Sequence, residues 1–216
     1  MVSIQCFTFG PFEENTYLLY DETNEAVVID PGCSNRHEEK ELSDFIASQQ
    51  LTVKLLLNTH CHVDHVLGNS FIKDTYRVPF WMHKLDEPVL RSAKVLAPLY
   101  GVHNYQEATS DRFIDERDVI TFGNQQLHIL FLPGHAPGHI GFYHPQQKFV
   151  IGGDVLFQHS IGRTDLPGGN FDVLINSIHQ KLFTLPDDVV VYPGHGPETT
   201  IGEEKVSNPF CALTPR

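Results

Sequence analysis

Three histidines, an aspartate and a cysteine stand within six consecutive residues of this sequence, in the segment NTHCHVDH (residues 58–65). Imidazole and carboxylate side chains bind transition metals and transfer protons. Packed into a protein without a ligand, so many ionisable groups would lose their hydration without compensation. The density of these groups therefore indicates a metal site rather than a set of core histidines.

The spacing of the segment divides its ligands between two ions. In an extended chain alternate side chains point the same way, so His60 and His62 can reach one ion. Asp64 and His65 follow where the chain turns into the next segment, and they can reach a second ion. Cys61 lies between two ligands but points away from them, so we expect its side chain to pack in the core.

Three later segments supply the remaining ligands, namely His135 in LPGHAPGH, Asp154 in IGGDV and His195 in YPGHGP. The predicted first site is His60, His62 and His135, the predicted second site is Asp64, His65 and His195, and Asp154 bridges them. Asp64 and Asp154 are also the candidate catalytic residues. Mixed imidazole and carboxylate ligands suit zinc above all, and also iron or manganese. Two ions about 3.5–4 Å apart would hold a bridging hydroxide, which we expect to be the nucleophile.

The elements that must position these ligands repeat along the chain. Strands are expected at residues 16–20, 26–30, 53–58, 148–154 and 188–195, and helices at residues 37–50 and 171–185, the second with Asn170 as its N-cap. Each half contains strand, helix, strand: the first strands end at Asp30 and Asp154, and the last strands lead into His60 and His195. This pattern predicts an α/β fold of two similar halves, with polar residues converging at the carboxyl ends of the strands.

Residues 84–101 interrupt the repeat with a helical pattern. An apolar stripe is expected at Val89, Ala93, Leu96 and Tyr100. Pro88 suits the first turn of a helix, and Gly101 suits its C-terminal cap. The insertion either covers a cleft or only packs on the core, and packing is the favoured interpretation.

Composition limits the class of protein and its partners. The chain has 216 residues, enough for one large domain, and a net charge of −12. That charge argues against a nucleic-acid partner and against an anionic membrane surface. No signal peptide and no apolar run of membrane-spanning length are visible. The four cysteines form no CxxC pair, so we expect reduced thiols and a cytoplasmic protein.

The HxHxDH segment, together with His135, Asp154 and His195, resembles the motif set of the metallo-β-lactamase superfamily, over nearly the whole chain. The segments PGHAPGH, GGDVLF, SIGRTDLPGGN and YPGHGPETTIGEEKVSNPF are similar to the glyoxalase II-like branch, in its short single-domain bacterial form. The resemblance implies a four-layer αββα sandwich. It also implies a dinuclear metal-dependent hydrolase of a small thioester such as S-lactoylglutathione.

The same resemblance implies roles for residues near the ligands. Arg163, in GRTD, falls where this branch places a basic residue beside the metals, so it is the candidate for binding a substrate carboxylate or amide oxygen, oriented by Asp165. His139 is expected to support the ligands rather than bind metal. Tyr100, Phe157 and His159 are candidates for the pocket wall.

The chain departs from full-length glyoxalase II at its C-terminus. Those enzymes add a helical domain whose basic residues hold glutathione, whereas only a short tail follows His195 here. We therefore expect one domain over residues 1–216, without the glutathione-binding helical domain. The thiol carrier, the physiological acyl group and the oligomeric state stay open.

Other functions remain as alternatives. The first is a mononuclear iron persulfide dioxygenase, because such enzymes of the same branch keep the outer motif and a GRTD element. A β-lactamase is disfavoured, since no export signal is visible and Asp154 stands at the bridging position. The acidic charge disfavours a nuclease, and the complete set of seven ligands disfavours a non-catalytic binding module.

Overall fold

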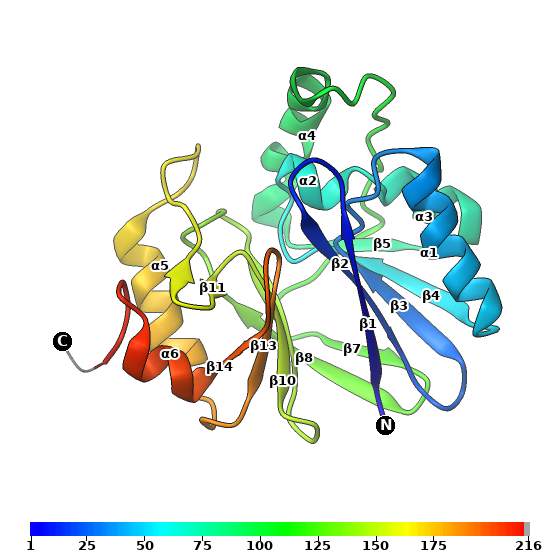
Figure 1. The fold of residues 1–216 in the computed structure, drawn as a ribbon. Coiled ribbons are helices and arrows are strands. Elements are labelled where there is room, and N and C mark those ends of the chain that lie inside the picture. Colours follow the sequence, from blue (N-terminus) through cyan, green and yellow to red (C-terminus); the bar gives the residue numbers. More distant parts are fainter. Residues whose placement is uncertain (214–216) are drawn as a thin grey trace.

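Two six-stranded β-sheets face each other at the centre of the molecule, and helices cover their outer faces (Figure 1). The computed structural model describes residues 1–213. The first sheet runs in the order β1 (Ser3–Phe9), β2 (Glu14–Tyr20), β3 (Glu25–Ile29), β4 (Thr52–Leu57), β5 (Phe80–Met82), β6 (Arg112–Phe113). The second runs in the order β14 (Thr199–Thr200), β13 (Val190–Pro193), β10 (Phe149–Gly153), β9 (Ile140–His144), β8 (Gln125–Phe131), β7 (Val119–Phe122).

Helices form the two outer layers. α1 (Arg36–Ser48) and α3 (Asn69–Tyr76) lie outside the first sheet, while α5 (Phe171–Ser177) and α6 (Ile201–Ser207) lie outside the second (Figure 1). A short hairpin of β11 (Leu156–Phe157) and β12 (Ser160–Ile161) follows β10. This arrangement is the expected four-layer αββα sandwich.

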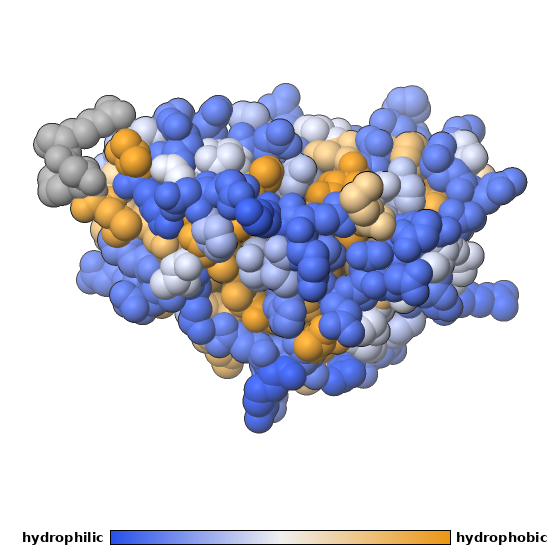
Figure 2. Space-filling model, turned by 90° about the horizontal axis from the view of Figure 1, so that it is seen from below, coloured by the Kyte–Doolittle hydropathy of each residue, from blue (hydrophilic) through white to orange (hydrophobic). Residues whose placement is uncertain are grey.

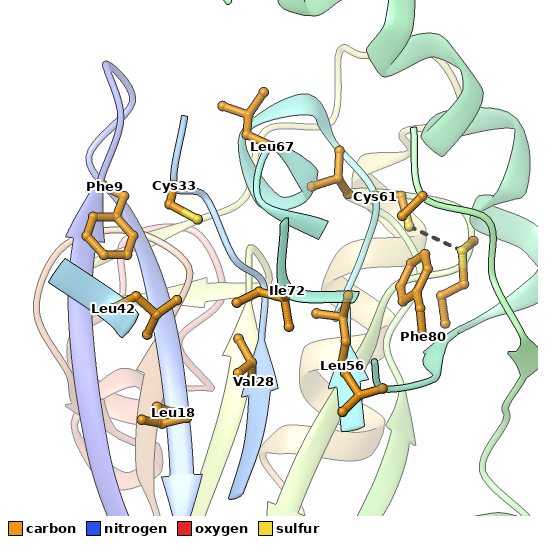
Figure 3. Packing of buried hydrophobic residues seen from close by; sticks show 14 of the residues in the cluster. Phe9, Leu18, Val28, Cys33, Leu42, Leu56, Cys61, Leu67, Ile72 and Phe80 are labelled. Carbon is orange, nitrogen blue, oxygen red and sulfur yellow. Dashed lines mark hydrogen bonds between the residues drawn. The ribbon is translucent and has the colours of Figure 1, made fainter. Parts of the chain in front are cut away.

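Alternation of side chains along the strands creates three apolar cores. Leu18 of β2 packs toward the helices of its own half, while its neighbour Leu19 packs between the two sheets. In the second half, Val150 of β10 packs toward α5 and Ile151 packs between the sheets. Figure 3 shows the first outer core, where Leu42 of α1 lies against Leu18 and Val28. Because neighbouring residues of a strand point to opposite faces, a strand segment that contacts two apolar cores carries apolar residues at successive positions.

The predicted repeat is present. β3 and β4 pair in parallel with α1 between them in the chain, and β10 and β13 pair in parallel with α5 between them. Side-chain oxygens of Asn35 and Asn170 accept hydrogen bonds from the first-turn N–H groups of α1 and α5 and so cap these helices. The expected N-cap at Asn170 is thus confirmed, and the carboxyl ends of β4, β10 and β13 meet at one edge of the sandwich.

The expected helix over residues 171–185 is shorter and less regular than its pattern predicts. The α-helix ends at Ser177, a π-helical turn continues from Ile178 to Leu182, and residues 183–185 form a turn. The wider π turn still leaves Leu174, Ile178 and Leu182 buried in the second outer core. An apolar pattern with a period near four residues does not distinguish the two helical forms.

The inserted segment folds as a 3₁₀ turn η1 (Lys84–Asp86), the helix α4 (Glu87–Leu96) and a second 3₁₀ turn η2 (Ala97–Tyr100). Gly101 adopts a left-handed φ of 84°, and Pro88 lies in the first turn, both as expected. The expected apolar stripe is wrong in part. The most buried side chains are Leu90, Ala93 and Ala97, whereas Tyr100 is half exposed. The change from 3.6 to 3.0 residues per turn at Ala97 rotates Tyr100 away from the predicted face.

The insertion packs on the core and also projects beyond it. Leu90 and Ala93 join the first outer core, in agreement with the favoured packing interpretation. The end of α4 and the turn η2 rise above both sheets in Figure 1 and carry the exposed side chains of Val95 and Leu99, respectively. Tyr100 packs edge-on against Phe12 of the β1–β2 hairpin, with 4.7 Å between the ring centroids. The insertion therefore contacts the β1–β2 hairpin at the top of the first sheet.

The opposite face of the molecule is mainly hydrophilic. Figure 2, seen from below, shows polar groups over most of this face, with apolar patches between them. Within residues 1–213 no helix is both long enough and apolar enough to cross a membrane. All four cysteines are free thiols, as expected. Cys61 is fully buried, and its sulfur lies 3.7 Å from that of Met82, a contact drawn as a dashed line in Figure 3.

Candidate metal centre

The seven predicted ligands lie together at the edge of the sandwich where β4, β10 and β13 end. His60 and His62 lie in the loop after β4, and Asp64 and His65 lie in the short helix α2 (Val63–Val66). Asp154 directly follows β10, and His195 follows β13. His135 comes from the loop between β8 and β9. The fold thus brings the seven predicted residues together at one edge of the sandwich.

The first predicted group forms a tight cluster of ring nitrogens. Nε2 of His135 lies 2.8 Å from Nδ1 of His62 and 3.2 Å from Nε2 of His60. His60 and His135 are buried, and their rings meet nearly at right angles. Three imidazole nitrogens aimed at one point match the ligand set of a metal ion such as zinc.

The second predicted group joins two imidazoles and a carboxylate. Oδ2 of Asp64 lies 3.1 Å from Nε2 of His195 and 3.7 Å from Nε2 of His65. His65 is fully buried, and Asp64 and His195 are partly exposed. These atoms also lie close enough together to bind one ion.

Asp154 stands between the two groups. Its Oδ2 lies 3.5 Å from Nε2 of His135 in the first group and 3.6 Å from Nε2 of His195 in the second. Its Oδ1 lies 3.5 Å from Nε2 of His65. Both Asp154 Oδ1 and His65 Nε2 are buried without a hydrogen-bond partner. A cation between them would satisfy both atoms, so the residues present fit a metal ion.

Most of the histidines are held through their second ring nitrogen. Nδ1 of His135 donates to the carbonyl of Arg163 at 2.8 Å, and Nδ1 of His195 donates to the carbonyl of Phe12 at 3.0 Å. Nδ1 of His60 lies 3.1 Å from the hydroxyl of Thr59. These contacts orient the rings so that each Nε2 faces the centre, as is usual for histidines that bind metals.

Asp30 supports the centre from below. Its carboxylate accepts hydrogen bonds from the N–H of Thr59 at 2.7 Å, from Nδ2 of Asn58 at 3.1 Å and from Nδ1 of His65 at 3.2 Å. Asp30, His60 and His65 lie close enough together to form a third possible ligand group. Because the oxygens of Asp30 are already occupied by these donors, we assign Asp30 to orienting His65 and the loop after β4.

The electrostatics of the two groups differ. Burial lowers the pKa of His60 well below its usual value, and burial beside His135 lowers the pKa of His62 to about 3. These imidazoles are neutral at pH 7, the form that binds metals. Burial also disfavours charge on His65, but the Asp64 and Asp154 carboxylates outweigh it and raise its pKa well above the usual value. The carboxylates of the second group therefore favour a bound cation.

Glycines let the backbone approach the centre. A Cβ atom at Gly194 would lie 2.1 Å from Oδ1 of Asp154 and 2.7 Å from Cε1 of His65. A Cβ atom at Gly162 would lie 1.9 Å from the carbonyl oxygen of Asp154. Real Cβ contacts are not that short, so both positions require glycine, as the Gly-rich turns around the ligands suggest.

Other residues of the centre carry no signal in the sequence. Glu14, from the start of β2, is buried beside His65, and its Oε1 has no hydrogen-bond partner. Burial raises the pKa of this carboxyl well above its usual value. Asp86 of the insertion is buried against the backbone of the ligand loops. Both depend on contacts between distant segments, which no local pattern reveals.

His139 lies behind the ligands, in agreement with the expected supporting role. Its Nε2 accepts a hydrogen bond from the N–H of Asp154 at 3.0 Å, and its ring stacks on that of His60 with 4.7 Å between centroids. The ring is fully buried, and burial lowers its pKa well below the usual value. It thus fixes the backbone at the bridging position.

Arg163 lies on the exposed side of the centre, directly after the β11–β12 hairpin. Its Nε and Nη2 each donate to the Asp165 carboxylate at 2.8 Å, and 61% of its side-chain surface is exposed. The expected orientation of Arg163 by Asp165 is therefore present in the structure. A surface ion pair of this kind contributes little to stability, which leaves the guanidinium available to a ligand.

The other candidate wall residues differ in position. Phe157 lies near the centre, with its ring centroid 6.4 Å from that of His195. The expected role of His159 in the pocket wall is not supported, because its ring turns toward Ser207 and Glu203 of α6. A left-handed φ of 56° at His159 directs the side chain away from the centre.

Comparison with known proteins agrees with this geometry. The family model described as the metallo-beta-lactamase superfamily matches residues 9–195. The hydroxyacylglutathione hydrolase GloC of Haemophilus influenzae is 39% identical, over 97% of this chain and 98% of its own length. Among solved structures, the B3 metallo-beta-lactamase BLEG-1 is 35% identical with a TM-score of 0.85, over 97% of this chain and 99% of that chain. TTHA1623 in a di-iron-bound form is 36% identical with a TM-score of 0.84, over 95% of this chain and 99% of that chain.

Family model, relatives and solved structures cover nearly the whole chain and agree with the two-sheet architecture and the His/Asp clusters described above. The expected resemblance is therefore confirmed, and the chain belongs to the metallo-beta-lactamase superfamily.

Proposed function

We propose that this protein is a metal-dependent hydrolase that binds two divalent ions and cleaves a small thioester. The observation that carries the proposal is the position of Asp154, whose carboxylate lies within 3.6 Å of histidine nitrogens from both ligand groups. The proposed first site is His60, His62 and His135, and the proposed second site is Asp64, His65 and His195, with Asp154 shared by both.

Two ions at these sites would supply an activated water molecule near neutral pH and would polarise the carbonyl of the substrate. The protein's own residues hold the geometry for this chemistry. Asp64 and Asp154 supply the negative charge of the second site, while His60, His62 and His135 supply neutral ligands to the first. The ligand types suit zinc, and the di-iron form of the related TTHA1623 keeps iron as an alternative, with manganese also compatible.

The choice of a thioester rests on the relatives rather than on the ligands. The 39% identity to a hydroxyacylglutathione hydrolase over nearly all of both chains supports a substrate similar to S-lactoylglutathione. Arg163 would bind a carboxylate or amide oxygen of that substrate, because Asp165 holds two of its nitrogens and Nη1 makes no hydrogen bond within the described residues 1–213. Phe12, Tyr100 and Phe157 would line the apolar side of the substrate.

The proposal is tested by loading the protein with zinc, iron or manganese, measuring bound metal, and following thiol release from S-lactoylglutathione and a panel of acyl thioesters. We expect two ions per chain and thioester cleavage. His62→Ala should lower that activity by at least about 100-fold, whereas His128→Ala, on the exposed face of β8, should not. A fully loaded protein that cleaves no thioester would refute the proposed reaction.

β-Lactam hydrolysis is a second candidate, favoured by the 35% identity to BLEG-1. The matching measurement uses a chromogenic cephalosporin with the same metal-loaded samples. Faster turnover of the cephalosporin than of every thioester would favour this activity. The persulfide dioxygenase alternative predicts oxygen uptake with glutathione persulfide in the iron form, and thioester cleavage without oxygen uptake would exclude it.

A further inference from the structure

A buried carboxylate of the inserted segment joins two of the loops that carry ligands. Oδ2 of Asp86 accepts a hydrogen bond from the N–H of Cys61 at 2.8 Å, and Oδ1 accepts one from the N–H of Gly138 at 2.5 Å. Only 1% of the Asp86 surface is exposed. One side chain from outside the ligand set therefore contacts the backbone of both halves of the molecule.

Both contacts lie beside the first ligand group. Cys61 stands between His60 and His62, and Gly138 lies in the turn that leads from His135 to the supporting residue His139. In this group, Nε2 of His135 lies within 3.2 Å of a ring nitrogen of His60 and of a ring nitrogen of His62. Their convergence depends on the relative position of the two loops, and Asp86 is bonded to both.

Asp86 and the loop of Gly138 approach each other closely. A Cβ atom at Gly138 would lie 2.6 Å from the backbone nitrogen of Asp86 and 2.8 Å from its Oδ1. The glycine therefore allows the close approach on which the hydrogen bond depends. Both oxygens of the carboxylate accept from backbone donors, so an amide in its place would set its NH₂ group against one of these N–H groups.

We infer that Asp86 is a positioning residue for the first metal site, which holds the loop of His60 and His62 against the loop of His135. This inference rests on the proposed binding of two metal ions. It also gives the inserted segment a role beyond packing, because η1, which ends at Asp86, places the carboxylate between the loops. Ligand sets tolerate shifts of only about 0.5 Å before affinity falls, so a relaxed loop contact weakens the site.

Asp86→Asn tests the inference directly, with Asp21→Asn as its matched control. Asp21 is also buried, and its carboxylate accepts from the N–H groups of Thr23 at 3.0 Å and Asn124 at 2.8 Å. It thus joins the two halves in the same manner, in the turns after β2 and β7 and not in a ligand loop. A purely structural role for Asp86 predicts the same behaviour for both variants.

The readout is zinc binding by the metal-free proteins, measured by competition with a chromophoric chelator, together with urea unfolding. We expect Asp86→Asn to lower the affinity for the tighter-bound zinc ion, or for both zinc ions, by about 10- to 100-fold. Asp21→Asn should keep the wild-type zinc affinity, whatever its free energy of unfolding. Wild-type affinity in Asp86→Asn, or an equal loss in Asp21→Asn, would overturn the inference.

A second variant covers the case in which Asp86→Asn does not fold. Gly138→Ala keeps the carboxylate but forces it away from the loop, and the same weakening of zinc binding is expected. Wild-type zinc affinity in this variant would also overturn the inference. The outcome is independent of the proposed reaction, because a wild-type protein that binds two zinc ions but cleaves no thioester would refute the reaction and leave the role of Asp86 in place.

Discussion

Oδ2 of Asp30 lies 3.2 Å from Nδ1 of His65, and both side chains are buried. The contact fixes the ring so that Nε2 of His65 points toward Asp154, where it lies without a hydrogen-bond partner. A carboxylate behind a histidine also makes the imidazole a stronger ligand. Asp30 directly follows β3, and His65 lies in α2 after β4. The first strand of this β/α unit thus places a residue that supports a candidate ligand following the second strand.

Replacement of Asp30 by Asn is expected to weaken the second site more than the first. The amide nitrogen would face N–H donors of Thr59 and Asn58, and His65 would lose its charged partner. We expect about 10- to 100-fold weaker binding of one of two zinc ions, measured by chelator competition. Asp172→Ala, on the exposed start of α5, serves as a control that should leave both ions bound tightly. Equal weakening of both ions would contradict the assignment.

Loss of the Asp154 carboxylate is expected to reduce metal binding and activity more than loss of the Asp30 carboxylate. Asp154→Ala removes the carboxylate whose oxygens lie within 3.6 Å of histidine nitrogens from both groups. We expect the metal content to fall from two ions toward one and thioester cleavage to fall about 1000-fold, or about 4 kcal/mol in activation free energy. Metal analysis and thiol release measure the two effects on the same samples. Two tightly bound ions in Asp154→Ala would show that another residue joins the sites.

Gly194→Ala tests whether the backbone must approach the centre. The added Cβ would lie 2.1 Å from Oδ1 of Asp154, so the carboxylate or the loop must move. We expect a loss of the second ion and a destabilisation of about 1–3 kcal/mol in urea unfolding. Gly196→Ala separates this clash from backbone strain, because a Cβ there meets open space but its φ is 71°. If both variants bind metal equally well, the clash at Gly194 is not decisive.

The seven candidate ligands could be proposed from the sequence because their signal is local. His60, His62, Asp64 and His65 stand together, and each remaining ligand follows an apolar strand or lies in a Gly-rich turn. The fold class followed from the two strand–helix–strand units, whose strands are buried on both faces and therefore read as continuous apolar runs. Local composition and spacing were sufficient for these features.

The supporting residues required the tertiary structure. Glu14 and Asp86 are isolated acidic residues in segments without a metal motif, and they reach the centre only because distant segments meet there. The face of α4 was misplaced because a 3₁₀ turn begins at Ala97, and apolar periodicity does not report a change of helix type. Strands as short as β6 and β14, two residues each, also leave no periodic signal.

Acid stability offers a test away from the metal centre. Burial opposes charge on Asp21, but hydrogen bonds from Thr23, Asn124 and Gln125 outweigh it and lower its pKa to about 2. A depressed folded-state pKa stabilises the fold above the unfolded pKa near 4, and this contribution is lost as the pH falls through about 2. In urea unfolding of the metal-free protein, we expect Asp21→Asn to lower the free energy of unfolding by on the order of 2 kcal/mol relative to wild type at pH 6. Near pH 2 the difference in this free energy should be much smaller. A difference that does not change with pH would exclude a role for the charge.

Substrate binding by Arg163 can be separated from its support of the metal centre. The side chain pairs with Asp165, whereas the backbone carbonyl accepts the hydrogen bond from Nδ1 of His135. Arg163→Ala keeps that carbonyl, so metal content should not change. Loss of a charge-assisted hydrogen bond should raise KM for an anionic thioester about 10- to 100-fold with little change in kcat.

The matched control is Arg117→Ala, because Arg117 pairs with Asp115 two residues away, through the same two nitrogens, on another exposed loop. It should leave KM unchanged, whereas Arg163→Lys should recover part of the loss, because an ammonium keeps the charge but not the fork of donors. The KM increase should also shrink for a thioester without a carboxylate. If Arg163→Ala affects charged and uncharged thioesters equally, the guanidinium does not bind the substrate carboxylate.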